Sequence, residues 1–275
     1  MAKISLKKGI LDVVLYIIVF IVAQLVVLYA GAGIWAAVKH EGFQATLQAM
    51  KAGGNPALLA ITTVFSSIIT LIVFLKAKWV VLTRDYLLSK PWFTLLWVAL
   101  FTLGAIIPLE FLYEHLGLEM DENTGKLFEG LMKEPWGYVA VGILVPLTEE
   151  IVFRGAILRS LLDMMSKKNH WVAIMISAAM FGLAHGNAAQ FVNALLMGLL
   201  LGWMYYRTKS LVPGILMHWV NNTMAYILAN LVPQSDGKLI DLFGGNEQTV
   251  YYAVGFSLCI LIPSFIQMII RLKKA

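Results

Sequence analysis

Polar residues that could together hydrolyse a bond stand within or beside apolar stretches in the third quarter of the chain. They are Glu149, Glu150, Arg154, His185, His218 and Asn222. A carboxylate or an imidazole can take a proton from water, and an imidazole or an amide can donate a hydrogen bond to a developing oxyanion. Ionisable side chains inside a membrane cost several kcal/mol unless they are paired or hydrated. Their presence here therefore predicts a functional site that activates water.

The spacing of these residues predicts which of them share a helix face. Glu150 and Arg154 are four residues apart, so on an α-helix they can form an ion pair. Glu149 lies about 100° round the helix from Glu150, so it can face a cavity while its neighbour stays paired. His218 and Asn222 are also four residues apart and share a face of another helix.

Each group also has a purely structural interpretation. The carboxylate–arginine pair alone could be an ion pair near the cytoplasmic interface. His185 alone could be an interfacial histidine beside a short turn. The histidine–asparagine pair alone could be one of the interhelical hydrogen bonds that hold membrane bundles together. We favour one shared cluster, because a single functional site explains why all three polar groups are kept in apolar surroundings despite the energetic cost.

The composition is that of a membrane protein. Of the 275 residues, 60% are hydrophobic and 13% are charged, whereas soluble domains usually carry about 25% charged residues. The net charge of +5 does not indicate nucleic acid, because the basic residues fall between apolar runs. Such residues are typical of topology signals and of contacts with anionic lipid headgroups. The single cysteine, Cys259, excludes an intrachain disulfide.

Apolar runs long enough to cross a hydrocarbon core of about 30 Å predict an all-α, polytopic transmembrane bundle of about eight spans. We treat residues 1–275 as one integral membrane domain, with the motifs in 141–225 and the first span uncleaved. The predicted spans are Ile10–Tyr29, Pro56–Phe74, Trp92–Phe111, Trp136–Leu158, His170–Ala184, Ala189–Tyr206, Leu211–Leu231 and Tyr251–Ile270.

The loop charges predict the orientation. If the N-terminus is cytoplasmic, 16 of the 21 basic residues fall on the cytoplasmic side, and Lys39, Lys51, Lys126, Lys133 and Lys238 fall on the other. The positive-inside rule then places both termini in the cytoplasm of a cell-membrane protein. The acidic stretch Phe111–Pro135 would lie outside as a solvated loop, with a substrate gate as the alternative.

The residues of the cluster fall into three motifs. The sequence reads Glu-Glu-Ile-Val-Phe-Arg at 149–154, Phe-Gly-Leu-Ala-His at 181–185 and His-Trp-Val-Asn-Asn at 218–222. In order and spacing they resemble the motifs of the CAAX-protease and bacteriocin-processing family of intramembrane peptidases, also called CPBP or Abi. The resemblance covers roughly Val141–Ala225. The preceding 140 residues are similar only in having several spans.

The resemblance implies a role for each matched residue. Glu149 would polarise the attacking water with help from His185, and His218 and Asn222 would stabilise the oxyanion. The remaining motif residues, Glu150 and Arg154, would support and orient the first glutamate.

A metal is one open point in this hypothesis. Catalytic zinc typically takes three protein ligands, and Glu149, His185 and His218 could supply them. There is no His-Glu-x-x-His string, since His40-Glu41 lacks the second histidine. The family is described both as metalloproteases and as metal-free glutamate enzymes, and we favour metal-free chemistry.

The resemblance implies a membrane-associated peptide or lipidated protein as substrate, such as a prenylated C-terminus or a bacteriocin leader. The alternative is a non-catalytic membrane protein, either a transporter or a scaffold for bacteriocin immunity. Transporters also place polar groups near the midplane, often on paired half-repeats, and we find no such repeats. Glu149 and His185, the residues that a non-catalytic relative would be expected to lose, are both present.

Overall fold

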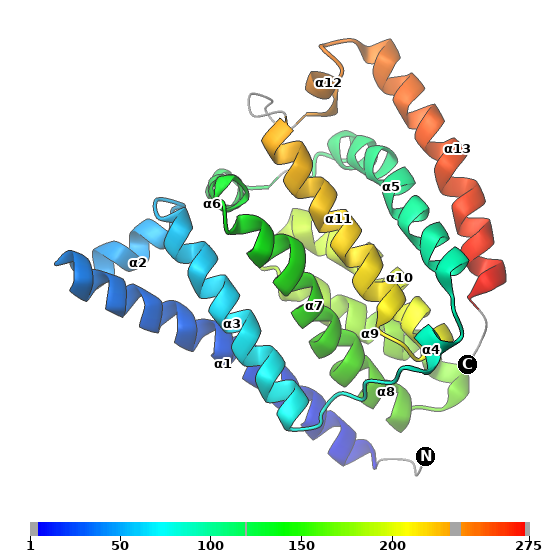
Figure 1. Cartoon of the computed structure of the whole chain (residues 1–275), viewed down its shortest axis with the longest axis horizontal. Coiled ribbons are helices and arrows are strands. Elements are labelled where there is room, and N and C mark those ends of the chain that lie inside the picture. The colour runs from blue at the N-terminus through cyan, green and yellow to red at the C-terminus, as the bar shows by residue number, and fades with distance from the viewer. Residues whose placement is uncertain (1–4, 119, 232–237, 273–275) are drawn as a thin grey trace. The chain divides into compact units, whose positions relative to one another are not determined.

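The computed structural model describes residues 5–118, 120–231 and 238–272. All regular structure in these residues is helical, which confirms the all-α prediction (Figure 1). The helices are α1 (Leu6–Lys39), α2 (Phe43–Lys51), α3 (Pro56–Lys76), α4 (Asp85–Leu88), α5 (Trp92–His115), α6 (Glu122–Lys133), η1 (Tyr138–Leu144), α7 (Val145–Glu149), η2 (Glu150–Leu158), α8 (Arg159–Met164), η3 (Lys167–Asn169), α9 (His170–Leu183), α10 (Ala188–Thr208), α11 (Val212–Leu231), α12 (Leu239–Leu242) and α13 (Glu247–Arg271).

The chain divides into two compact units. Unit 1 comprises Met1–Leu82 and Met120–Gly202, and unit 2 comprises Thr83–Glu119 and Trp203–Ala275. The motif segment 141–225 is shared between them, so the single membrane domain that the sequence predicts stays a prediction.

In unit 1, α1 and α3 form the scaffold for the helix that carries the glutamates. They cross closely, because a Cβ atom at Gly31 would lie 2.4 Å from Cγ2 of Thr62. Helix α3 contacts η1 and α7, and α1 contacts η2 and α8. Phe20 of α1 packs edge-on against Phe153 of η2, with the ring centroids 5.5 Å apart.

The two ends of α3 contact different parts of unit 1. At its start, Pro56 packs beside Gly130 of α6, where a Cβ atom would lie 3.3 Å from Cβ of Pro56. Beyond its end, the carbonyl of Trp79 accepts a hydrogen bond of 2.7 Å from Nη2 of Arg159. Helices α6 and α8 therefore lie near opposite ends of α3.

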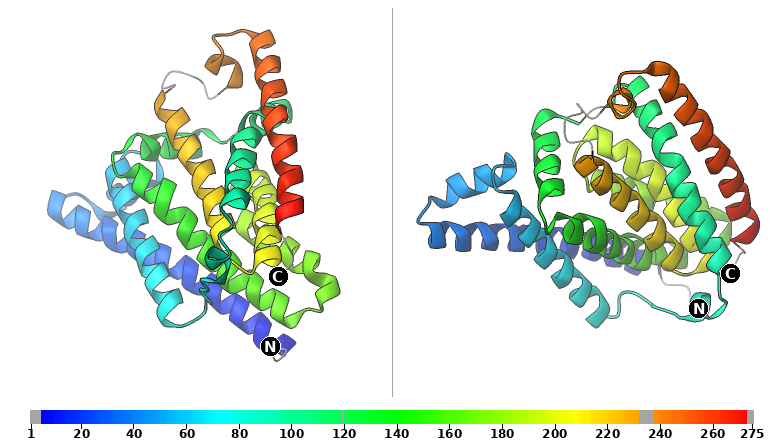
Figure 2. Two further views of the ribbon diagram at one scale, coloured as in Figure 1. Left: turned by 45° about the vertical axis from the view of Figure 1, so that its right-hand side comes forward. Right: turned by 45° about the horizontal axis from the view of Figure 1, so that its top comes forward.

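Unit 2 is built on α5 and α13, which run side by side in Figures 1 and 2. The approach is close, since a Cβ atom at Gly104 would lie 2.8 Å from the backbone nitrogen of Leu261. Helix α11, which carries the third motif, also packs against α5. Nε of Arg207 donates a hydrogen bond of 2.6 Å to the carbonyl of Leu272.

Within the described residues, five helices are long and apolar enough to cross a membrane: α1, α3, α5, α10 and α13. They coincide with five of the eight predicted spans. The other three predicted spans are helical too, but α9 has only 14 residues and the fourth is interrupted. Helix α11 has 20 residues and carries polar side chains, His218 and Asn222 among them.

The fourth predicted span, Trp136–Leu158, is not a uniform α-helix. Two stretches, η1 and η2, have π-helical i→i+5 hydrogen bonding, with α7 between them. The helical run also continues through α8 to Met164. Such π turns are rare and occur frequently at functional sites.

One charge counted towards the topology is not a loop charge. Arg154 is completely buried within η2, so its position is set by the site and not by the membrane face. Without it, the split of basic residues is 15 to 5, and the predicted orientation is unchanged.

We therefore expect reporter fusions to place both termini and the Lys76–Lys90 segment in the cytoplasm, and Glu114–Glu134 outside. The physical reason is the excess of lysine and arginine on the cytoplasmic side. The measurement is paired alkaline phosphatase and green fluorescent protein fusions at each position. A cytoplasmic signal from the Glu114–Glu134 segment would contradict the order of the first three spans.

Candidate active site

The motif glutamates lie at the junction between α7 and η2. Helix α7 ends at Glu149, and η2 begins at Glu150. Glu150 is completely buried, as is every other residue of η2, whereas Glu149 is only partly buried. The structure thus separates the two carboxylates as the sequence predicts, with one accessible and its neighbour enclosed.

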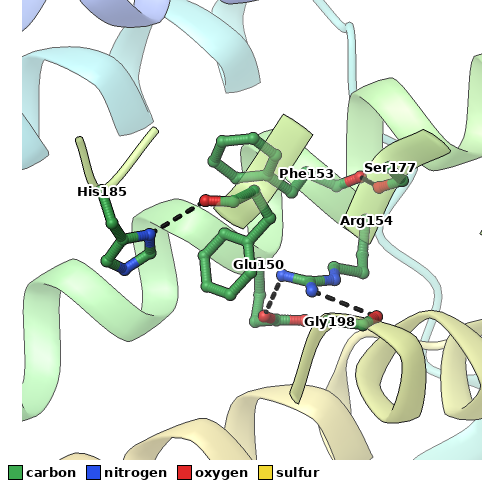
Figure 3. A network of polar contacts seen from close by, with 7 residues as sticks. Glu150, Phe153, Arg154, Ser177, His185 and Gly198 are labelled. Atoms are coloured by element: carbon green, nitrogen blue, oxygen red, sulfur yellow. Dashed lines mark hydrogen bonds and ion pairs between the residues drawn. The ribbon is translucent and has the colours of Figure 1, made fainter. Parts of the chain in front are cut away.

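The predicted ion pair is present. Nη1 of Arg154 donates to Oε1 of Glu150 over 2.8 Å, and both side chains are 1% exposed (Figure 3). Taking two charges out of water is costly, and a buried charge tolerates no loss of its partner. The pair is therefore enclosed by the protein rather than exposed on its surface.

Two further contacts hold the Arg154 guanidinium. Nη2 donates to the carbonyl oxygen of Gly198 on α10 over 3.3 Å. Cζ lies 4.4 Å from the centroid of the Phe181 ring on α9, which is a cation–π contact. The arginine is therefore fixed by η2, α9 and α10 together.

Helix α9 is tied to the π-helix by a side chain. Oγ of Ser177 is buried and donates a hydrogen bond of 3.0 Å to the carbonyl of Phe153, inside η2. The Phe153 ring also packs against Phe181, with centroids 5.1 Å apart. These contacts fix the face of η2 from which Arg154 extends.

His185 follows the end of α9 and is oriented by the backbone. Its Nδ1 lies 2.9 Å from the carbonyl oxygen of Phe181 (Figure 3). A carbonyl oxygen can only accept, so Nδ1 carries the proton and Nε2 of the neutral ring keeps its lone pair. The ring stands at 88° to that of Phe181, with centroids 5.0 Å apart. His185 is thus held with a basic nitrogen directed away from its own helix.

Phe181 connects the parts of the site that lie in unit 1. Its ring contacts both the Arg154 guanidinium and the His185 imidazole, and its carbonyl fixes the latter. The first two motifs are thus brought together, as the shared-cluster hypothesis predicts.

The third motif lies in unit 2. His218 and Asn222 are on α11, and His218 is 4% exposed. Nδ2 of Asn221 donates a hydrogen bond of 3.2 Å to Oδ1 of Asn222. Their participation with Glu149 and His185 stays a prediction.

The metal hypothesis can be compared with the side chains present. In the part of the chain that the structure describes, no group of three or more His, Cys, Asp or Glu side chains gathers in a way that could hold a metal ion. The predicted ligand set takes Glu149 and His185 from unit 1 and His218 from unit 2, so it stays a prediction, and we derive no step through a metal.

Two residues of the site were missed in the sequence. Ser177 gives no sequence signal, because a serine in an apolar helix more often bonds to its own backbone. Gly198 does give one. It opens the string Gly-Leu-Leu-Leu-Gly at 198–202, and glycines four residues apart are typical of close helix packing in membranes.

Comparison with known proteins adds independent support. Residues 132–224, which contain all three motifs, match the family of type II CAAX prenyl endopeptidases described as Rce1-like. The resemblance to the CAAX-protease family is confirmed. The chain is 28% identical over 153 residues to the putative membrane peptidase YdiL of Bacillus subtilis, covering 54% of this chain and 61% of the relative. It is 30% identical over 150 residues to the membrane-embedded CAAX protease MroQ of Staphylococcus aureus, covering 53% and 60%.

The chain thus matches about three fifths of the length of these two relatives. A third relative, the UPF0177 protein YxdF of Lactococcus lactis, is 30% identical over 104 residues, covering 38% of this chain and 51% of the relative. No solved structure matches the chain. The apolar helices and the membrane peptidase relatives together show a multi-pass membrane protein.

Proposed function

We propose that this protein is an intramembrane endopeptidase that hydrolyses a peptide bond with water activated by Glu149 and His185. The observation that carries the proposal is that the two adjacent glutamates have different surroundings. Glu150 is fully buried and neutralised by Arg154, while Glu149 next to it is partly accessible. A buried ion pair is a costly feature, and holding one beside an accessible carboxylate suits a site that must fix a general base.

In the proposed reaction, Glu149 takes a proton from water as the water oxygen adds to the substrate carbonyl carbon. Nε2 of His185 accepts a hydrogen bond from the same water, which its backbone-held Nδ1–H permits. His218 and Asn222 donate hydrogen bonds to the resulting oxyanion. Glu149 then passes its proton to the amide nitrogen as the carbon–nitrogen bond breaks, which leaves a carboxylic acid and an amine, and the acid then gives its proton to the amine.

The substrate class we propose is a peptide or lipidated protein segment at the membrane. The matched family is that of type II CAAX prenyl endopeptidases, and one relative is named a CAAX protease. Helix α1 packs against η2 and exposes many large apolar side chains, which suits a substrate that reaches the site from the bilayer.

The deciding experiment compares membrane peptides in cells that express the wild-type protein or Glu149→Ala at equal levels. Wild-type cells should contain cleaved peptides that the variant cells lack, and the variant should accumulate their precursors. Quantitative mass spectrometry of membrane fractions measures both. Identical peptide profiles, with both proteins present in the membrane, would favour the transporter or immunity-scaffold alternative.

A further inference from the structure

Helix α10 approaches α9 more closely at Gly198 than any residue with a side chain allows. A Cβ atom there would lie 2.9 Å from Cβ and 3.0 Å from Cα of Ala178, and 3.2 Å from Nη2 of Arg154. The Cα atom belongs to the backbone and cannot rotate away. The glycine therefore lets the backbone of α10 reach the guanidinium.

This close approach brings the carbonyl oxygen of Gly198 within hydrogen-bonding distance of the positively charged Arg154 side chain. Gly198 O accepts the hydrogen bond from Nη2 of Arg154 over 3.3 Å, in completely buried surroundings. A carbonyl has two lone pairs, so it can serve both its own helix and the arginine. Among the residues that the structure describes, none accepts a hydrogen bond from Nε of Arg154. Loss of the Gly198 bond would thus leave a second donor of the same buried cation unsatisfied, which is costly.

We infer that Gly198 is a positioning residue, which holds Arg154 against Glu150 through its carbonyl and through its lack of a side chain. Its effect on catalysis rests on the proposed function, because it would act on Glu149 only through that ion pair. The contact itself does not depend on that function and can be tested separately.

The chain offers a matched control one helical turn away. A Cβ atom at Gly202 would lie 2.9 Å from Cγ2 of Ile174 and 3.4 Å from Cδ2 of Leu158. This glycine belongs to the same close contact with α9 but does not meet Arg154. The atoms it meets belong to the side chains of Ile174 and Leu158, and no backbone atom is among them. Gly202→Ala therefore perturbs packing between the same two helices without touching the arginine.

The first arm measures stability in detergent. Each glycine is changed to alanine in the wild-type protein and in a Glu150→Leu/Arg154→Met background, which replaces the ion pair by apolar side chains and is expected to fold. Gly198→Ala should lower the thermal midpoint by several degrees more in the wild type than in the background. Gly202→Ala should lower it equally in both, because residues without shared partners act additively. Equal losses for Gly198→Ala in both would overturn the inference.

The second arm measures turnover against pH. A displaced arginine leaves negative charge beside Glu149, so Gly198→Ala should reduce kcat at neutral pH on the order of 10- to 10²-fold, as sub-ångström to ångström misplacements do. The acidic limb of the profile should move to higher pH, whereas Gly202→Ala should leave it in place. Equal limbs for both variants would contradict the positioning role. If the wild type hydrolysed no membrane peptide, the proposed function would fail, and the stability arm would still decide the contact.

Discussion

Glu149→Ala and His185→Ala should each reduce turnover about 10²–10⁴-fold, which is the usual cost of removing a general base or its partner. Glu149 is the accessible carboxylate of the adjacent pair. Because Nδ1 of His185 donates to the carbonyl of Phe181, Nε2 can accept a hydrogen bond from water. Neither side chain belongs to the fully buried set, so the protein should still fold in the membrane. Initial rates on a fluorogenic membrane peptide, with purified variants, measure the loss.

The control for this prediction is His170→Ala. His170 also places Nδ1 2.9 Å from a backbone carbonyl, that of Lys167, but at the opposite end of α9. Its replacement should leave turnover near the wild-type level. A folded Glu149→Ala protein with wild-type turnover would show that another group takes the proton.

Arg154→Ala should reduce activity at neutral pH, and the loss should be partly recovered as the pH rises. Removing the guanidinium leaves Glu150 negatively charged and buried beside Glu149, and nearby negative charge favours the protonated form of a carboxyl group. The active base is then depleted at neutral pH and restored at higher pH. Arg154→Lys should perform better than alanine and worse than arginine, because lysine keeps the charge but lacks the planar fork that meets Glu150 and Gly198.

A pH–rate profile of each purified variant checks this. Breaking a buried pair from one side costs about 3–5 kcal/mol, so Arg154→Ala alone could be poorly folded. The double variant Glu150→Gln/Arg154→Ala removes the stranded charge and should return the acidic limb towards its wild-type position. An unshifted limb in folded Arg154→Ala would leave the arginine with a packing role only.

The parts of the site that the sequence predicted are those set by local geometry and composition. The Glu150–Arg154 pair follows from spacing along one helix, and the spans follow from apolar runs that the bilayer selects. The approach of Phe181 to both Arg154 and His185 depends on tertiary packing, and no pattern in the sequence predicted it. Gly198 and Ser177 act across helices, so their roles could not be predicted from spacing alone.

The hydrogen-bonding pattern of the fourth span was also beyond the sequence. Nothing in its apolar run distinguishes i→i+4 from i→i+5 bonding, because both patterns satisfy the backbone and most of the run is apolar on every face. Helix α1 is 34 residues long against a predicted span of 20. The helix continues beyond both ends of the predicted span, and α1 also contacts α2 and α8. Such tertiary contacts could not be predicted from an apolar run.

Helix η2 carries the site's ion pair at its start, and the helical run that follows it carries Arg159, which is anchored to the loop after α3. A π turn contains about one residue more than an α turn, so η2 accommodates an additional residue between these two anchors. If one residue after Arg154 were deleted and the segment reverted to α geometry, the helix beyond it would keep its phase, and Arg159 would still face the Trp79 carbonyl. The same deletion from a segment that is already α-helical would turn everything beyond it by about 100°. The π segment is thus the part of this helical run that best tolerates the loss of a residue.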